Sequence, residues 1–158
     1  MTTVWRLLIQ EPDITLPWMT HKGRIAIGWG EIGDIRVLET PEAIAQAIRD
    51  RNERHPDHAG KAAANIQHGT NSLYDFCFRM KTRELVIISD GTKRQSVWEV
   101  AGEYEYAQPS EAPLNYQHQR LATALDLDAD ELWLKAGGRL ADGQINFQTL
   151  GRCANEIE

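Results

Sequence analysis

The sequence contains only two cysteines, Cys77 and Cys153, and neither lies in a Cys-x-x-Cys or Cys/His spacing. This scarcity excludes a disulfide framework and a classical zinc module, and we expect both thiols to stay reduced. The chain also lacks an apolar run as long as a membrane span, and residues 1–6 do not begin a secretion signal. We therefore expect a cytoplasmic protein with no membrane partner and no metal or other cofactor.

Basic charge is not in excess: 17 Lys and Arg face 23 Asp and Glu, for a net charge of −6. Residues 1–100 hold 13 side chains of each sign, whereas residues 101–158 hold 4 basic and 10 acidic ones. Because phosphate contacts supply most non-specific affinity, this balance excludes a tight, sequence-blind DNA binder. Two local groups of basic residues could still form a binding face, although solvated helix and hairpin faces are the simpler interpretation. The first group is Arg49, Arg51, Arg54, His55, His58 and Lys61, and the second is Arg79, Lys81, Arg83, Lys93 and Arg94.

Linkers, repeats and low-complexity tracts are absent as well, and 158 residues at 42% hydrophobic content suit one domain over residues 1–158. Hydrophobic periodicity and turn residues predict strands at 4–10, 24–29, 85–88, 95–107 and 118–125. Helices are expected at 41–55, 59–68, 71–80 and 129–136, a loop with Pro17 and Trp18 at 11–23, and either a strand or a helical turn at 145–150. This order indicates an α+β fold on a curled, mostly antiparallel sheet.

Several cap and turn signals are specific enough to test. Asp128 is expected to cap the helix at 129–136, and Asp90-Gly91 indicates a turn. Thr40 followed by Pro41 predicts a capped helix start. Asn71 and Ser72 read as the cap of a later helix, with Ser72 and Asp75 approximating a capping box.

The stretch Gly28-Trp29-Gly30 is the most informative part of the chain. Glycines on either side of Trp29 allow positive φ angles and the close approach of another molecule. The indole is then either a core anchor or one wall of a slot for a flat ligand. This choice decides most of what the sequence says about function.

Five segments in order resemble the PUA-like superfamily, especially the EVE-like domains at the N-terminus of Mrr-type and McrB-type restriction proteins. They are Trp5, residues 26–34 around Trp29, residues 76–88, residues 98–106 and residues 118–120. The resemblance implies a pseudo-barrel with flanking helices and a pocket that accepts an extruded, often modified nucleobase. The chain departs from the family at Thr82-Arg83-Glu84, where a Gly-Asp turn is usual.

Such a pocket needs two aromatic walls and short polar side chains that read the base edge. Trp29 is the first expected wall, and either Trp18 or Trp98 the second, with Phe76 nearby. The expected edge readers are Asp34, Asn71, Ser72, Ser89 and Asp90. Core packing is the simpler explanation of Trp98 and Phe76, capping explains Asn71 and Ser72, and the turn explains Asp90. Backbone contacts are expected from Lys22, Arg24, Lys93, Arg94, His118 and Arg120.

Three functions remain open. The first is a non-catalytic reader of a flipped, modified base, in DNA rather than RNA, acting in restriction, defence or regulation beside a separate effector protein. The chain contains no Glu-x-Lys or Gln-x-Lys pair, so no nuclease activity is expected. The second is an amidohydrolase, because ASCH-type PUA-like enzymes use a Thr, Lys and Glu set and Thr20, Lys22 and Glu31 occur nearby, in a different spacing. The third is a protein-interaction module with an acidic C-terminal surface.

Overall fold

The computed structural model describes residues 1–55, 62–140 and 149–158. Its strands are β1 (Val4–Leu8), β2 (Arg24–Ile27), β3 (Leu85–Ser89), β4 (Arg94–Tyr106), β5 (His118–Leu125) and β6 (Leu150–Arg152). Its helices are α1 (Pro12–Lys22), α2 (Ile35–Leu38), α3 (Pro41–Arg54), α4 (Ala62–Tyr74) and α5 (Ala129–Lys135), with shorter turns η1 (Gly30–Ile32), η3 (Asp75–Arg79) and η4 (Pro109–Glu111).

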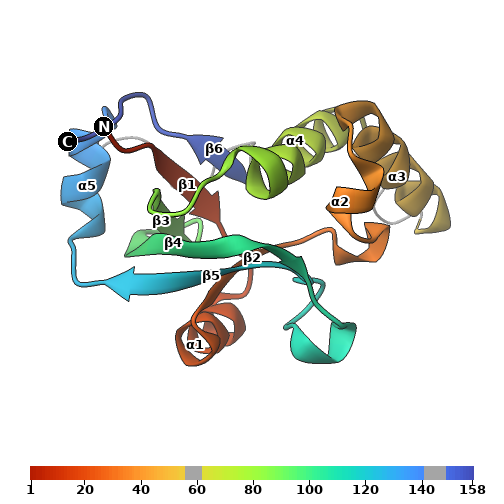
Figure 1. Cartoon of the computed structure of the whole chain (residues 1–158), viewed down its shortest axis with the longest axis horizontal. Helices are drawn as coiled ribbons and strands as arrows, with labels where there is room; N and C mark the ends of the chain where they lie inside the picture. The colour runs from red at the N-terminus through yellow and green to blue at the C-terminus, as the bar shows by residue number, and fades with distance from the viewer. Residues whose placement is uncertain (56–61, 141–148) are drawn as a thin grey trace.

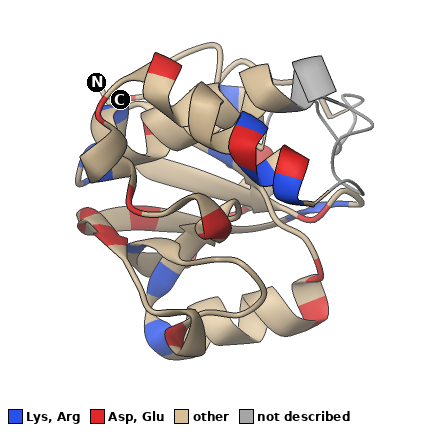
Figure 2. Cartoon of the chain, turned by 90° about the vertical axis from the view of Figure 1, so that its right-hand side faces the viewer, with Lys and Arg blue, Asp and Glu red and all other residues tan. Residues whose placement is uncertain are grey.

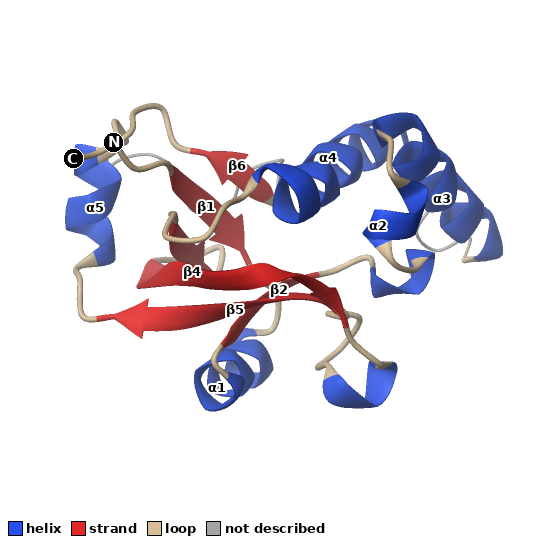
Figure 3. Cartoon of the chain, in the orientation of Figure 1, coloured by secondary structure: helices blue, strands red, loops and turns tan. Residues whose placement is uncertain are grey.

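The strands form one six-stranded sheet in the order β2-β5-β4-β3-β1-β6. Only β1 and β3 run parallel, and every other neighbouring pair is antiparallel. The α+β class with a mostly antiparallel sheet is therefore confirmed. Because β2 and β6 lie at the two edges, the described strands do not close into the expected barrel (Figure 3).

The helices lie around the sheet at different places. In Figure 1, α1 lies next to β2, while α3 and α4 lie side by side beyond the other part of the sheet. Helix α5 packs on β3 and β4 at the far end. Within the described residues, no helix combines the length and the apolar composition that a bilayer crossing requires.

Several local predictions are confirmed. Thr40 caps α3 by accepting the Ala43 N–H at 3.1 Å, and Pro41 opens the helix. Asp128 caps α5 by accepting the Glu131 N–H at 2.9 Å. Asp90 accepts the N–H groups of Thr92 and Lys93 in the turn between β3 and β4.

The expected loop at 11–23 is wrong, because these residues form α1. Pro12 opens this helix, and Gly23 ends it with φ 65°. Pro17 lies inside it, at the cost of one backbone hydrogen bond. The Thr15 hydroxyl donates to the Gln10 and Glu11 carbonyls, and Thr15 and Met19 are fully buried. Packing on the sheet therefore outweighs the helix-breaking signal of the proline.

The predicted break between two helices near residue 70 is also wrong. Helix α4 runs through Gly69 and Ser72 to Tyr74 and continues as the wider π turn η3, in which the Met80 N–H donates to the Asp75 carbonyl at 2.8 Å. Ser72 caps nothing, since its buried hydroxyl accepts the Leu150 N–H from β6 at 3.1 Å. The expectation for 145–150 lies outside the described residues apart from positions 149 and 150, and so does the proline at 56.

Strand β4 contains a register shift between Val100 and Tyr104, and the residues on either side of the shift still face the same core. The register passes from Val100 opposite Ala122 to Tyr104 opposite Arg120, so β4 advances by four residues while β5 advances by two. Two extra residues preserve the alternation, and Trp98, Val100 and Tyr104 all belong to the main core. Val97 faces a second core under α5, which explains why both faces of this strand are buried there.

Candidate functional site

Trp29 follows the end of β2 in a left-handed backbone conformation, with φ 62° and ψ 29°. The expectation that its neighbouring glycines carry the positive φ is wrong, because neither Gly28 nor Gly30 does. A non-glycine residue in this region costs on the order of 1 kcal/mol or more, so the surrounding structure must hold it there.

Gly30 is needed for space rather than for its dihedral angles. A Cβ at this position would lie 1.6 Å from the Gln117 Oε1 and 2.5 Å from the Asn115 carbonyl oxygen. The Gly30 N–H donates to that same carbonyl at 2.9 Å, and its own carbonyl accepts the Tyr106 hydroxyl at 2.6 Å. The turn after Trp29 is therefore tied to both sides of the β4–β5 connection.

His118 holds the Trp29 carbonyl in place. The Ile35 N–H donates to the Tyr104 hydroxyl oxygen at 3.2 Å, so the hydroxyl proton is left for His118 Nδ1 at 2.6 Å. The other ring nitrogen, Nε2, then carries the proton and donates to the Trp29 carbonyl at 2.9 Å. Burial lowers the pKa of His118 to about 4, with Asp34 and Glu31 opposing that shift in part, so the ring is neutral at pH 7.

The Trp29 indole rests on helices α3 and α4. A Cβ at Gly69 would lie 3.1 Å from the indole Cε2 and Cζ2 atoms and 3.0 Å from Ile48 Cδ1. Gly69 is thus the point where the α4 backbone makes room for the ring. The indole remains only partly buried, because its other side borders a hollow.

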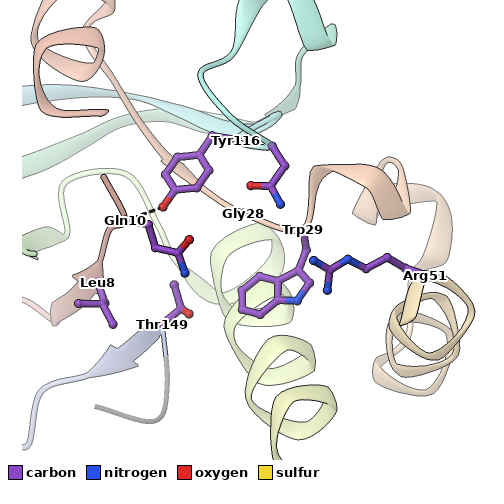
Figure 4. A pocket seen from close by; sticks show the side chains of 8 residues that line it. Leu8, Gln10, Gly28, Trp29, Arg51, Tyr116 and Thr149 are labelled. Atoms are coloured by element: carbon purple, nitrogen blue, oxygen red, sulfur yellow. Dashed lines mark hydrogen bonds between the residues drawn. The ribbon is translucent and has the colours of Figure 1, made fainter. Parts of the chain in front are cut away.

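This hollow is a cavity of about 150 Å³ at the carboxyl end of β1. Trp29 and Tyr116 lie on either side of Gly28, and Gln10 faces them from the end of β1 (Figure 4). The Tyr116 hydroxyl accepts the Gln10 N–H at 3.0 Å, which fixes the second ring. Among the described residues, the lining consists of Leu8, Gln10, Gly28, Trp29, Arg51, Asn115, Tyr116 and Thr149.

Arg51 reaches the cavity from α3 and points toward Trp29 (Figure 4). It is 8% exposed, and its buried Nε atom has no hydrogen-bond partner within the described ranges of the chain. The nearest carboxylate oxygen, Glu31 Oε1, lies 3.7 Å from Nε, and Nη1 reaches Asn52 Oδ1 at 3.4 Å. Buried guanidinium groups are normally well hydrogen-bonded, so Arg51 has donor capacity left for a ligand.

Arg51 and Tyr116 were absent from the expected pocket. Arg51 was grouped with solvated charges, although it follows Ile44 and Ile48 at i+7 and i+3 and so lies on the apolar face of its helix. That spacing could have identified it. Tyr116 lies in the connection before β5, where no periodic pattern indicates which way it points.

Of the residues expected in the base pocket, only Trp29 lines this cavity. Trp18 lies on α1 against the main core, and Trp98 and Phe76 are buried in that core. Ser72 and Ser89 are fully buried as well. The remaining three have local partners, which are Arg36 for Asp34, Gln67 for Asn71, and the β3–β4 turn for Asp90.

The expected backbone contacts do not form one surface. His118 and Arg120 are 0% and 3% exposed, so burial prevents either from reaching a phosphate, and this part of the prediction needs correction. Arg120 instead donates to the carbonyls of Gly102, Phe76 and Met80.

The other four cations are dispersed. Arg94 pairs with Asp130 at 2.6 Å and lies over the Trp133 ring, and Arg24 pairs with Glu105. Lys22 and Lys93 are exposed on α1 and on the β3–β4 turn. On the face shown in Figure 2, acidic and basic residues are interspersed.

The residues considered for an amidohydrolase or for a metal site do not come together in the described part of the chain. Thr20 and Lys22 lie on the exposed side of α1, whereas Glu31 contacts Arg51 and Asn115, and none of the three lines the cavity. No group of three His, Cys, Asp or Glu side chains among the described residues is placed to hold a metal ion. Burial raises the pKa of Cys77 to about 12, which leaves it a poor nucleophile.

Fold and site together define an α+β domain with a small, aromatic-walled cavity at one end of a mixed sheet. Residues 5–134 match the model of the family described as a domain of unknown function, DUF8426. The chain therefore belongs to the DUF8426 family. No curated protein matches it.

Proposed function

We propose that this DUF8426 chain is a non-catalytic nucleic-acid-binding module that receives an extruded, modified nucleobase in the cavity beside Trp29. The proposal includes a PUA-like relationship of the fold, with DNA as the favoured nucleic acid and a restriction, defence or regulatory setting. Any cleavage would then belong to a separate effector protein.

The observation that carries the proposal is a partly exposed indole bordering a ring-sized hollow. The cavity of about 150 Å³ equals in size an engineered protein cavity that accepts benzene, at about 150 Å³. His118 holds Trp29 in a strained backbone conformation, and the lack of a side chain at Gly69 lets the indole pack closely against α4. Backbone strain of this kind clusters at binding sites, and among the described non-glycine residues with positive φ only Trp29 lines the cavity.

The free energy gained by stacking a base on Trp29 is comparable with the cost of extruding that base from a duplex. Extruding a base costs a few kcal/mol, and stacking on an aromatic ring returns about 1–3 kcal/mol. Hydrogen bonds to the base edge must supply the rest, and the polar side chains of Arg51, Gln10, Asn115 and Thr149 line the cavity. A mixed surface charge keeps backbone affinity low, so the base dominates selection.

The test is binding of short DNA and RNA duplexes that carry one modified or mismatched base, measured by fluorescence anisotropy. Trp29→Ala should weaken base-dependent binding by about tenfold or more, since it removes the stacking wall. Trp18→Ala is the matched control, because Trp18 is also a partly buried tryptophan but lies outside the cavity. Thermal melting of both variants monitors the fold.

Equal affinity of Trp29→Ala and the wild type would refute the proposal. Failure of every duplex to show base-dependent binding would refute it too.

A further inference from the structure

We propose that the cavity selects a single-ring base, a pyrimidine, and that Arg51 reads it through the acceptor atoms on the ring. This inference rests on the proposed function and adds the class of base and the residue that recognises it. Three features of the site lead to it: the size of the cavity, the fixed position of its walls and the unused donors of Arg51.

The size of the cavity favours one ring over two. Its volume of about 150 Å³ accommodates a six-membered ring, whereas typical sites for larger ligands have about 300–1,000 Å³. A purine adds a fused five-membered ring to the same thickness. Its second ring would extend beyond a hollow of this size, so a purine would bury a smaller share of its surface there than a pyrimidine.

The walls are not free to move. Trp29 has Gly69 and Ile48 at its back, with less space there than one added methyl group would need. Tyr116 is 4% exposed and its hydroxyl is bonded to the Gln10 N–H. Gly28 lies between the two rings, where a Cβ would be 3.6 Å from Tyr116 Cε1. The width of the slot is therefore set by backbone and core contacts.

Arg51 determines which edge is recognised. Its guanidinium can only donate hydrogen bonds, and its Nε has no acceptor within hydrogen-bond distance among the residues that the structure describes. Every pyrimidine base carries a ring carbonyl, an acceptor that is small enough to reach into this cavity together with the ring. The ligand would complete the hydrogen bonding that the protein leaves incomplete around Arg51.

Glu31 positions Arg51 without facing the ligand. Its Oε1 lies 3.7 Å from Arg51 Nε, and its two oxygens accept from Asn115 Nδ2 at 3.3 Å. Glu31 is not part of the cavity lining. It compensates the buried positive charge from outside the cavity lining, while Arg51 itself lines the hollow.

The experiment uses four duplexes that differ only in the extrudable base, which is cytosine, thymine, adenine or guanine. The wild-type chain should bind the two pyrimidines about tenfold more tightly than the purines. Arg51→Met should lower pyrimidine affinity about tenfold, because it removes hydrogen bonds to the acceptors. Arg49→Met is the matched control, since it removes the same charge from the exposed face of the same helix and should change affinity less than twofold.

Arg51→Met leaves Glu31 without its cation, so the double variant Arg51→Met with Glu31→Gln serves as a second test in which no charge is stranded. Free cytidine and uridine, which carry no phosphate, should compete with the pyrimidine duplexes, whereas inorganic phosphate should not. Competition by phosphate and not by the nucleosides would make Arg51 an anion site and overturn the inference.

The two proposals can fail separately. Base-dependent binding that requires Trp29 but ranks purines equal to pyrimidines would retain the reader function and refute the single-ring selection. Pyrimidine selection that persists unchanged in Arg51→Met and in the double variant would refute the role of Arg51. Loss of all base-dependent binding in the wild type would refute the reader function itself.

Discussion

The imidazole of His118 donates a hydrogen bond from Nε2 to the carbonyl of Trp29, 2.9 Å away and 89 residues earlier in the chain. This bond joins β5 to the residue that borders the cavity. Tyr104 fixes the tautomer from the other side of the ring. The conformation of Trp29 therefore depends on a buried neutral histidine.

This histidine should make stability depend on pH. Burial lowers its pKa to about 4 from an ordinary 6.5, so between these values the unfolded chain binds a proton that the folded chain excludes. The free energy of unfolding should fall as the pH is lowered through this window, by about 2 kcal/mol between pH 7 and pH 5. Urea unfolding at both pH values, compared between wild type and His118→Gln, isolates this contribution from that of the carboxylates. Identical pH dependence in the two proteins would contradict it.

Substitution by alanine should affect stability at only one of the two glycines beside Trp29. Gly30→Ala forces a methyl group to within 1.6 Å of Gln117 Oε1 and 2.5 Å of a backbone oxygen. We expect it to destabilise the fold by about 2–3 kcal/mol. Gly28→Ala meets only ordinary contacts at 3.4 Å or more, so it should leave the melting temperature nearly unchanged while narrowing the cavity. Thermal melting distinguishes the two, and equal melting temperatures would show that the turn can relax.

Gly69 and Trp29 should be energetically coupled. Alanine is favoured over glycine inside a helix by about 1 kcal/mol, yet here its methyl group would press on the indole. Gly69→Ala should therefore stabilise the chain less in the wild type than in a Trp29→Ala background, by about 1 kcal/mol. A double-mutant cycle from chemical unfolding measures this difference. If the two substitutions change the free energy of unfolding additively, the Trp29 ring and Gly69 are not energetically coupled.

Arg120 should be structural. It donates to the carbonyls of Gly102, Phe76 and Met80 at 2.8–3.0 Å and so satisfies acceptors in β4, in η3 and at the C-cap of η3. Arg120→Met leaves these buried oxygens without that donor and should cost about 3 kcal/mol or more. Arg24→Met provides the comparison, because the Arg24–Glu105 pair is exposed and should matter by less than about 1 kcal/mol. Similar losses in the two variants would contradict the assignment.

Much of the fold was predictable because its signals are local. The strand 118–125 and the caps at Thr40 and Asp128 were found from periodicity and capping residues alone. The failures were at α1 and α4, where Pro17 and Gly69 read as breaks. In α1, contacts with the core outweigh the helix-breaking preference of Pro17. In α4, contacts with Trp29 outweigh that of Gly69.

The site was less predictable than the fold. Trp29 was identified from its flanking glycines, but its partners in the cavity come from β1, α3 and the β4–β5 connection. The helical spacing of Arg51 from Ile44 and Ile48 predicts its burial, but only if an arginine is accepted as a member of an apolar helix face. The second aromatic wall, Tyr116, carries no local signal at all.

The sequence by itself determined most of the strands, the capped starts of α3 and α5, the scarcity of cysteine chemistry and the unusual glycine–tryptophan turn, because each depends on residues close together in the chain. Only the tertiary structure decided that Trp29 takes the strained conformation, that Gly69 seats its ring and that Arg51 points into the cavity. These features depend on contacts between segments dozens of residues apart. Local preferences do not encode such contacts, whereas close packing and the need to satisfy buried polar groups do.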